Sequence, residues 1–276
     1  MRRLLLIAGA LAAVATSAAA QPRLEPLWTL EGLESPESVA LSADGDFLYV
    51  SNVGGEGDAK DANGFISRVS TDGKVLEKAW ASGLDAPKGL ALKGERLFVT
   101  DITQIVELDA RTGKVLARYE APEAVFLNDA AVTPDGEIIA SDSGSGRIYA
   151  LEDGKVSVWV DDPRLRSING LLPEEGRLVI TTMAGLVLAI DWTSRKLDLL
   201  AVGVGQGDGI VPLGGGEYLV GEWPGRPFHM RKNGAVSTIA DTREAKVYYN
   251  DFILDGERLY VPNWMPGTLT AYRLSQ

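Results

Sequence analysis

The feature that most constrains this chain is a repeat of about forty residues. Six short runs each combine an apolar, strand-like segment with polar residues at its end, and they start at Leu48, Leu97, Ile138, Leu178, Tyr218 and Leu259. The starts are 49, 41, 40, 40 and 41 residues apart. A period of this length, filled with short strands and turns, is typical of a β-propeller blade.

Each repeat is expected to form four strands, and hairpin signals recur just ahead of most of the six runs or within the same unit. Asp-Gly or Asn-Gly pairs, which favour tight hairpins, begin at positions 44, 72, 135, 153, 233 and 255. The third repeat predicts strands over 130–133, 137–141, 147–151 and 156–160. The sixth repeat has sequence for three strands only, and the segment 27–30 is available as its fourth. Because ring closure hides edge strands, we expect an all-β, six-bladed propeller with four-stranded blades, closed by an N-terminal strand.

The first twenty residues have the pattern of a targeting segment. Arg2 and Arg3 precede a short, alanine-rich apolar run that ends before Gln21, as in a secretory signal peptide. The alternative is a membrane anchor, for which the run is short. We therefore expect 1–20 to be removed as a signal peptide and 21–276 to form one propeller domain. The product is expected to be periplasmic or secreted, with no membrane insertion.

The negative charge of the chain and its lack of cysteine and near-lack of histidine exclude several classes of partner and catalytic site. The formal charge is −11, and without Arg2 and Arg3 the remaining 25 basic and 38 acidic residues give −13. This charge argues against nucleic acid and anionic membranes as partners. The chain has no cysteine and a single histidine, His229, which we expect to be packed or solvated in an outer strand of blade five. Cys-His and Ser-His-Asp sites are therefore excluded, and any metal needs oxygen ligands.

One polar residue stands immediately before the apolar core of the first strand in every blade. First strands line the central channel of a propeller, so six side chains are expected to meet at the axis: Glu37, Lys88, Asn128, Asn169, Asp208 and Asn250. Second strands end at the same face and predict an outer ring: Asn52, Asp101, Asp142, Thr182, Glu222 and Asn263. The extra residues of blade one, 54–64, predict a lid over the axis.

Two carboxylates on one axis pose an electrostatic problem that a cation solves. Burying Glu37 and Asp208 is costly, and their charges repel each other. With Asn169 they offer hard oxygen ligands, which predicts one divalent cation, calcium first, with zinc or manganese as alternatives. The competing interpretation is a metal-free plug in which Lys88 pairs with one of the carboxylates. The candidate supporting residues are Asn250, Asp129, Asp101, Asp142 and Glu222.

The order of these motifs resembles the senescence marker protein and gluconolactonase family of six-bladed propellers, and more loosely the paraoxonase-like lactonases. The segments that carry the resemblance are "SPESVALSADGDFLYVSN", "LND", "NGL", "GDGI" and "NDFILDGERLYVPN", in blades one, three, four, five and six. The resemblance implies metal ligands at Glu37, Asn169 and Asp208, with Asn128 facing substrate and activated water. It also implies hydrolysis of lactones with a divalent cation, often calcium or zinc.

Two residues depart from the family pattern. Phe126 stands where members that act on sugar lactones often carry an arginine, and Lys88 adds a cation. An apolar or acidic ester is therefore the alternative to a sugar lactone. In the expected mechanism the metal polarises the carbonyl and activates water, and Asp208 is the general base. Asn128 positions water or the oxyanion, and Lys88 stabilises negative charge.

Other interpretations of the axis stay open. The rival function is a non-catalytic periplasmic propeller that binds a small ligand or a protein at its top face, because propellers host unrelated functions. Carbon–carbon bond formation, as in the related strictosidine synthases, is a third alternative. Trp223 and Trp264 directly follow second strands and are expected either to wall the pocket or to pack between blades. The enzyme interpretation predicts a monomer acting on a small-molecule lactone or ester.

Overall fold

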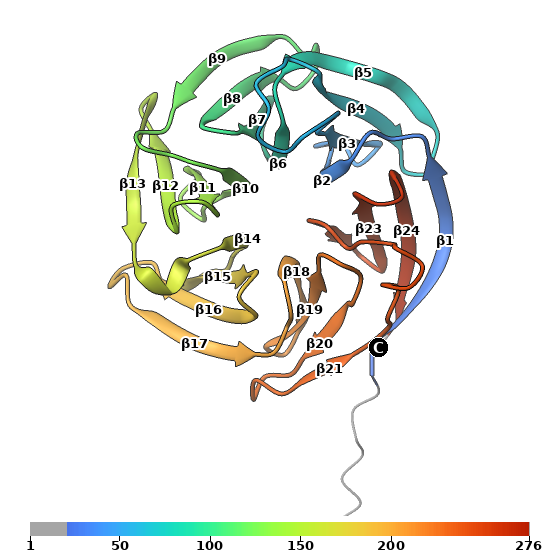
Figure 1. Ribbon diagram of the computed structural model, residues 1–276, viewed down its shortest axis with the longest axis vertical. Coiled ribbons are helices and arrows are strands. Elements are labelled where there is room, and N and C mark those ends of the chain that lie inside the picture. Colours follow the sequence, from blue (N-terminus) through green and yellow to red (C-terminus); the bar gives the residue numbers. More distant parts are fainter. Residues whose placement is uncertain (1–20, 276) are drawn as a thin grey trace, which may run out of the picture.

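The computed structural model describes residues 21–275, which form six antiparallel four-stranded sheets arranged as blades around one axis (Figure 1). The predicted six-bladed propeller is confirmed. The predicted signal peptide, 1–20, lies outside the described residues. Between residues 21 and 275 the helical structure is limited to one 3₁₀ turn, η1 (Pro163–Leu165). This part of the chain contains no helix with the length and apolar character needed to cross a bilayer.

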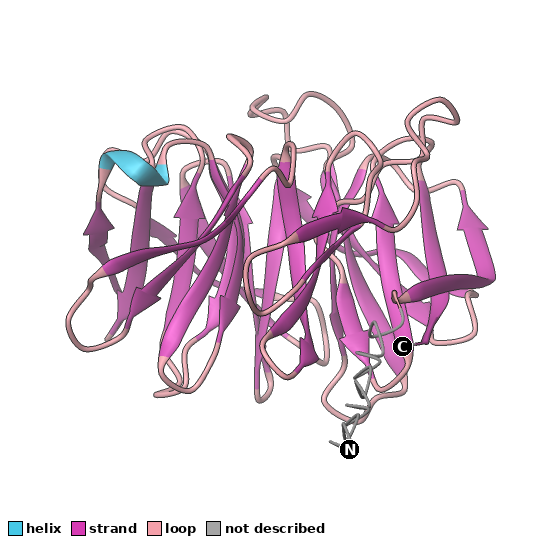
Figure 2. Cartoon of the chain, turned by 90° about the horizontal axis from the view of Figure 1, so that it is seen from below, coloured by secondary structure: helices cyan, strands magenta, loops and turns pink. Residues whose placement is uncertain are grey.

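The blades run from a first strand at the axis to a fourth strand at the rim (Figure 1). Seen from the side, the strands cross the thickness of the ring and loops cover its two faces (Figure 2). Blade one contains β2 (Pro36–Leu41), β3 (Phe47–Asn52), β4 (Gly64–Ser70) and β5 (Val75–Leu84). Blade two contains β6 (Pro87–Lys93), β7 (Arg96–Asp101), β8 (Gln104–Asp109) and β9 (Val115–Glu120). Blade three contains β10 (Leu127–Val132), β11 (Ile138–Asp142), β12 (Arg147–Glu152) and β13 (Lys155–Asp161).

The remaining three blades follow the same order. Blade four contains β14 (Ile168–Pro173), β15 (Arg177–Thr182), β16 (Leu186–Asp191) and β17 (Leu197–Val202). Blade five contains β18 (Gly207–Gly214), β19 (Glu217–Glu222), β20 (Phe228–Met230) and β21 (Val236–Thr238). Blade six contains β22 (Ile253–Asp255), β23 (Arg258–Asn263), β24 (Thr268–Ser275) and β1 (Arg23–Glu31).

Blade six joins the two ends of the described chain. β1 pairs antiparallel with β24, from Arg23 opposite Ser275 to Glu31 opposite Thr268. The predicted closing segment, 27–30, lies within β1, so the predicted closure of the ring is confirmed. Trp28 anchors this strand, with its ring centre 6.1 Å from that of Tyr260.

The apolar core lies between neighbouring blades. Ile139 and Ile148 of blade three pack in one cluster with Leu178 and Ile180 of blade four, and all four are at most 2% exposed. Each blade buries alternating side chains against the blade on either side, as the period of a β-strand allows. Packing of this kind fixes the position of each first strand, and with it the residues at the axis.

The segment between blades five and six departs from the repeat. No strand is present from residue 239 to 252, and β22 begins only at Ile253. A turn stands here in place of paired strands. The Thr242 hydroxyl holds it, with Val247 O at 2.6 Å and Gly225 O at 3.0 Å. Asn250 consequently precedes its strand as an irregular residue.

Candidate functional site

The six polar residues that precede the apolar cores of the first strands meet in one cavity at the axis. This axial pocket of about 180 Å³ is lined by Glu37, Lys88, Phe126, Asn128, Asn169, Met183, Asp208, Trp223, Asn250 and Trp264. All six predicted axial residues are among them, and each is at most 6% exposed. The repeat alignment therefore predicted the polar lining residue by residue.

A local break in strand pairing aims these side chains at the axis. In blades one to five the register between first and second strand shifts where the axial residue stands. In blade three, for example, the shift falls between Leu127 and Ala130, on either side of Asn128. Such a bulge turns a side chain out of the regular alternation. The axial residues are thus set by the strands themselves and not by flexible loops.

Hydroxyl groups on second strands fix the first strand of the next blade. Three such bonds hold the carbonyl oxygens of axial residues: Thr100 to Asn128, Ser141 to Asn169 at 2.8 Å, and Thr181 to Asp208 at 2.5 Å. The sequence analysis missed these residues. Their signal was the Ser or Thr at the second-to-last place of "LFVTD", "IIASD" and "LVITT". These bonds tie the geometry of the pocket to the packing of the ring.

Four oxygen atoms of the axial pocket lack a hydrogen-bond partner among the described residues. They are Glu37 Oε2, Asn128 Oδ1, Asn169 Oδ1 and Asp208 Oδ1. Buried polar atoms are seldom left unpaired, and two carboxylate with two amide oxygens form the hard ligand set that calcium prefers. Within residues 21–275 no cluster of three or more acidic or histidine side chains offers a metal site, so amides are needed to complete this one. The residues fit one divalent cation, with Asn128 added to the three predicted ligands.

Burial and mutual repulsion raise the pKa of both carboxyl groups in the pocket. For Glu37 burial is the main cause, followed by the charges of Asp208 and Asp251, and the charge of Lys88 acts the other way. Burial also dominates the raised pKa of Asp208, and the charges of Asp251 and Asp129 add to it. A cation at the four unpaired oxygens would favour the charged forms and lower both pKa values.

Lys88 does not form the ion pair of the metal-free plug. Its Nζ donates to Gly57 O at 2.6 Å and to Ala86 O at 3.0 Å, and it lies 4.2 Å from the centre of the Phe126 ring. In the described part of the chain no carboxylate forms a salt bridge with Lys88. Burial lowers the pKa of this amine to about 8, against the opposing effect of Glu37. Lys88 therefore anchors the predicted lid, which reaches over the neighbouring blade (Figure 1).

The predicted outer ring supports loops and does not line the pocket. Asp101 accepts the N–H groups of residues 85 and 86, at 3.1 and 2.8 Å. Asp142 accepts those of residues 125 and 126, at 2.9 and 2.8 Å. Glu222 forms an ion pair with the arginine four residues later. Asp101 and Asp142 thus hold the loops that lead into β6 and β10, so any support they give the axial residues is indirect.

Asp129 faces a second cavity of the channel and not the axial pocket. This cavity of about 290 Å³ is otherwise lined mainly by apolar side chains of first strands, and Asp251 also borders it. Asp129 accepts the N–H groups of Ala130 and Leu171, each at 2.6 Å. Burial raises the pKa of Asp251 to about 6, although the Ser38 hydroxyl donates to it at 2.6 Å. The sequence analysis missed Asp251; the repeated Asn-Asp pair of blades three and six was its signal.

The rest of the axial pocket is an apolar wall of four side chains, Phe126, Met183, Trp223 and Trp264. Both tryptophans therefore line the pocket. Trp223 also contacts Tyr248 edge to face, with ring centres 4.8 Å apart. Met183 was missed by the sequence analysis, although it follows its second strand as the two tryptophans follow theirs.

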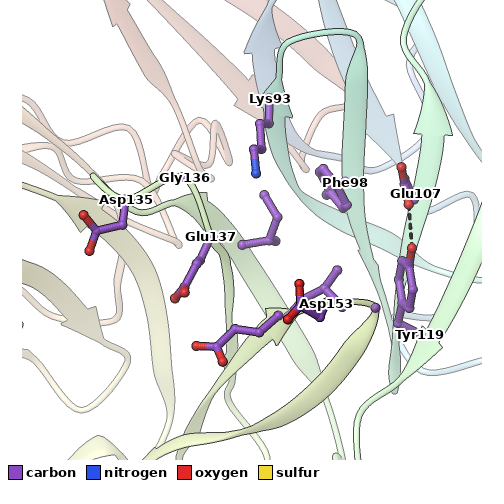
Figure 3. Close-up of a pocket in the computed structure, with 12 residues that line it drawn as sticks. Lys93, Phe98, Glu107, Tyr119, Asp135, Gly136, Glu137 and Asp153 are labelled. Carbon is purple, nitrogen blue, oxygen red and sulfur yellow. Dashed lines mark hydrogen bonds between the residues drawn. The ribbon is translucent and has the colours of Figure 1, made fainter.

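A larger cavity, of about 350 Å³, lies between blades two and three, at the hairpin ends remote from the axial residues (Figure 3). Its acidic side chains include Asp135 and Asp153, which are exposed to solvent. Glu107 already accepts the Tyr119 hydroxyl at 2.6 Å. None of its lining atoms is a buried polar group without a partner. The axial pocket is therefore the stronger candidate site despite its smaller size.

Comparisons with known proteins support the fold. No family model matches the sequence, and no curated protein matches it. Catalytically inactive virginiamycin B lyase from Staphylococcus aureus with quinupristin is 13% identical, with a TM-score of 0.65 over 92% of this chain and 99% of that chain. Its selenomethionine-substituted form gives 0.66 over 92% and 100% at 13% identity. A streptogramin B lyase gives 0.65 over 92% and 98% at 12% identity. Identities this low show a shared fold alone, and the resemblance to gluconolactonases stays a prediction.

Proposed function

We propose that this protein hydrolyses a small lactone or a related ester in the axial pocket with one divalent cation. The observation that carries the proposal is the set of four buried, unpaired oxygens, from Glu37, Asn128, Asn169 and Asp208. Four buried acceptors without partners are costly, and a bound cation would pair them. The motif order that resembles lactone hydrolases supplies the reaction class.

The four oxygen ligands would hold the cation, with calcium first and zinc or manganese as alternatives. When bound, the cation supplies positive charge that polarises a substrate carbonyl. The Asp208 carboxylate takes the proton of the attacking water. The lid anchored by Lys88 limits the access of bulk water to the reacting atoms.

The apolar wall indicates the kind of substrate. Phe126 and Met183 have no hydrogen-bond donor, and each tryptophan offers a single N–H. A sugar lactone would leave several hydroxyls unpaired against this wall, which disfavours its binding. The cavity of about 180 Å³ is also smaller than the ~300–1,000 Å³ of pockets for drug-sized ligands. We therefore propose a small lactone or ester with an apolar substituent.

The lyases of similar fold raise elimination as a second reaction class. The virginiamycin B lyase structure is of a catalytically inactive variant in which alanine replaces a histidine. The single histidine of this chain, His229, lies in β20, is 0% exposed and bonds Glu217 through Nε2 at 2.6 Å. His229 does not line the axial pocket. This placement favours hydrolysis by carboxylate and cation over a histidine-dependent reaction.

The test uses chelator-treated protein with a panel of δ-lactones and aryl esters, assayed with calcium, zinc or manganese restored. We expect turnover that requires one of these cations and is lost in Asp208→Asn. Saturable cation binding without turnover of any substrate would overturn the hydrolase proposal and favour the ligand-binding propeller. A periplasmic or secreted location and a monomeric state are part of the proposal, and fractionation and light scattering test them.

A further inference from the structure

Asn250 differs from the other two asparagines of the axial pocket in the atom that it leaves free. The nitrogen of Asn128 donates to a serine hydroxyl at 3.2 Å, and the Asn169 side chain hydrogen-bonds to Asp208, so each presents an unpaired oxygen. In Asn250 the oxygen accepts the Trp264 N–H at 3.0 Å. Its Nδ2 has no partner anywhere in residues 21–275. The pocket therefore holds one unpaired amide donor among four unpaired acceptors.

The cation that fits the four oxygens does not satisfy this nitrogen. An amide nitrogen offers two N–H donors and no lone pair for a metal, and the backbone N–H of Trp264 requires the oxygen where it stands. Asn250 is 1% exposed, so bulk water has little access to it. The missing partner is thus an acceptor atom that a ligand brings into the pocket.

The backbone around Asn250 holds this donor in place. Its own N–H donates to Pro262 O at 3.2 Å, and the N–H of Asp251 donates to Glu37 O at 3.1 Å. The second bond ties blade six to the backbone of the axial residue Glu37 in blade one. A donor fixed before the substrate arrives requires no reorganisation during the reaction, which is the condition for stabilising a developing charge.

We infer that Asn250 is a catalytic residue whose Nδ2 donates to the carbonyl oxygen of the substrate and to the oxyanion formed from it. The inference rests on the proposed function. Water attacks the carbonyl carbon, its proton passes to Asp208, and the carbonyl electron pair moves onto the oxygen that Asn250 contacts. When the carbonyl re-forms, the ring C–O bond breaks and the leaving alkoxide takes the proton. The sequence analysis expected Asn128 to position water or the oxyanion and Lys88 to stabilise negative charge. Asn128 instead presents an unpaired oxygen, and the Lys88 ammonium is already bonded to two carbonyl oxygens.

Two substitutions of Asn250 distinguish a hydrogen-bond donor to the substrate from a residue that only supports the fold. Asn250→Asp keeps an oxygen for the Trp264 N–H and removes the donor, whereas Asn250→Ser retains a donor hydroxyl. We expect kcat of Asn250→Asp to fall by roughly 10²–10³-fold, the usual effect of losing one oxyanion donor, with a much smaller change in KM. Asn250→Ser should recover part of kcat. Unchanged kcat in Asn250→Asp would overturn the inference, as would loss of cation binding in both variants.

A measurement without turnover completes the test. The Asn250 side-chain amide signal, identified by its loss in Asn250→Asp, is followed by NMR in cation-loaded protein during titration with phenyl methylphosphonate, an anionic mimic of the oxyanion. We expect a downfield shift of one amide proton, and no shift at saturation overturns the inference. If no ester or lactone is hydrolysed but the shift occurs, the proposed function fails and the donor assignment stands. If hydrolysis proceeds but the amide proton does not shift and Asn250→Asp leaves kcat unchanged, the proposed function stands and the donor role of Asn250 fails.

Discussion

Replacing Asp208 with asparagine should have opposite effects on the protein with and without a cation. Asp208 is 1% exposed, and one of its oxygens has no hydrogen-bond partner among the described residues. Without a cation, its charge is buried beside that of Glu37, and the amide removes this repulsion. We expect Asp208→Asn to stabilise the cation-free fold by roughly 1–3 kcal/mol, the scale of the penalty for an unpaired buried polar group.

The cation should reverse this order of stability. At a concentration of 100 times its dissociation constant, one bound cation stabilises the fold by ~2.7 kcal/mol. For a domain of this size each kcal/mol raises the melting temperature by a few degrees, so the wild type should gain roughly 5–11 °C. Asp208→Asn loses one of the two charged ligands and should gain almost nothing.

Thermal unfolding followed by circular dichroism, in chelator and then in rising calcium, measures both effects. The matched control is Asp129→Asn, which removes a carboxylate of similar burial that faces the second cavity and should keep the calcium shift. The reasoning is refuted if Asp208→Asn is less stable than the wild type in chelator and keeps its calcium shift. The same scans with zinc and manganese identify the preferred cation.

Four further predictions follow from the pocket and its supports. Calcium affinity should rise with pH and binding should release protons, because the pKa values of Glu37 and Asp208 are raised and their protons must leave before the oxygens bind metal. Calorimetry in two buffers of different ionisation enthalpy measures the proton release. For the same reason the stability that these two carboxyl groups contribute to the cation-free fold should be fully present below their ordinary pKa values, 4.5 and 3.8, and should be lost as pH rises through the raised ones; comparing the pH dependence of urea unfolding in the wild type and Asp208→Asn measures this contribution. Lys88→Met removes a charged donor to the lid, worth ~1.5–3 kcal/mol, so trypsin should cut after Lys60 roughly tenfold faster or more. Gly89→Ala should cost roughly 3 kcal/mol in urea unfolding, because its Cβ would lie 2.4 Å from Ala130 N.

Three of these predictions have a control variant or a contradicting outcome of their own. An affinity for calcium that does not change with pH would contradict the raised carboxyl pKa values. Lys60→Ala should abolish the tryptic fragment, and equal cleavage rates in Lys88→Met and wild type would show that the lid is held by other contacts. Gly176→Ala adds a Cβ with nothing within 4 Å, so it should change stability little and isolate the steric effect at Gly89.

The repeat of about forty residues, with polar residues at fixed positions in it, was sufficient to predict the fold and the polar lining of the axial pocket. Strand alternation, hairpin turns and a spacing near forty residues left few alternatives to a six-bladed ring. The position before the apolar core of each first strand placed Glu37, Asn128 and Asp208 at the axis, because a repeat puts equivalent residues at equivalent places. These are local and periodic signals, which a single sequence carries well.

The sequence could not predict which atom of each polar side chain faces the axial pocket. Asn128 and Asn250 occupy equivalent positions, yet one presents oxygen and the other nitrogen, because different neighbours bind the opposite end of each amide. In the competing interpretation Lys88 paired with a carboxylate, whereas it meets two carbonyl oxygens, one of them from the blade-one loop 54–64. Contacts of this kind depend on non-repeating segments, for which the period gives no information.

The pairing of β1 with β24 has a consequence for the time course of folding. Arg23–Glu31 and Thr268–Ser275 lie near opposite ends of the described chain, so this ladder forms only after the last strand is available. Blades one to five are built from hairpins between sequence neighbours, whereas this seam requires a loop that spans most of the molecule. We expect the seam to form last and to separate first. The lifetime of the native ring, as a rate of unfolding, would then be governed by one strand pair out of the eighteen that the six blades contain.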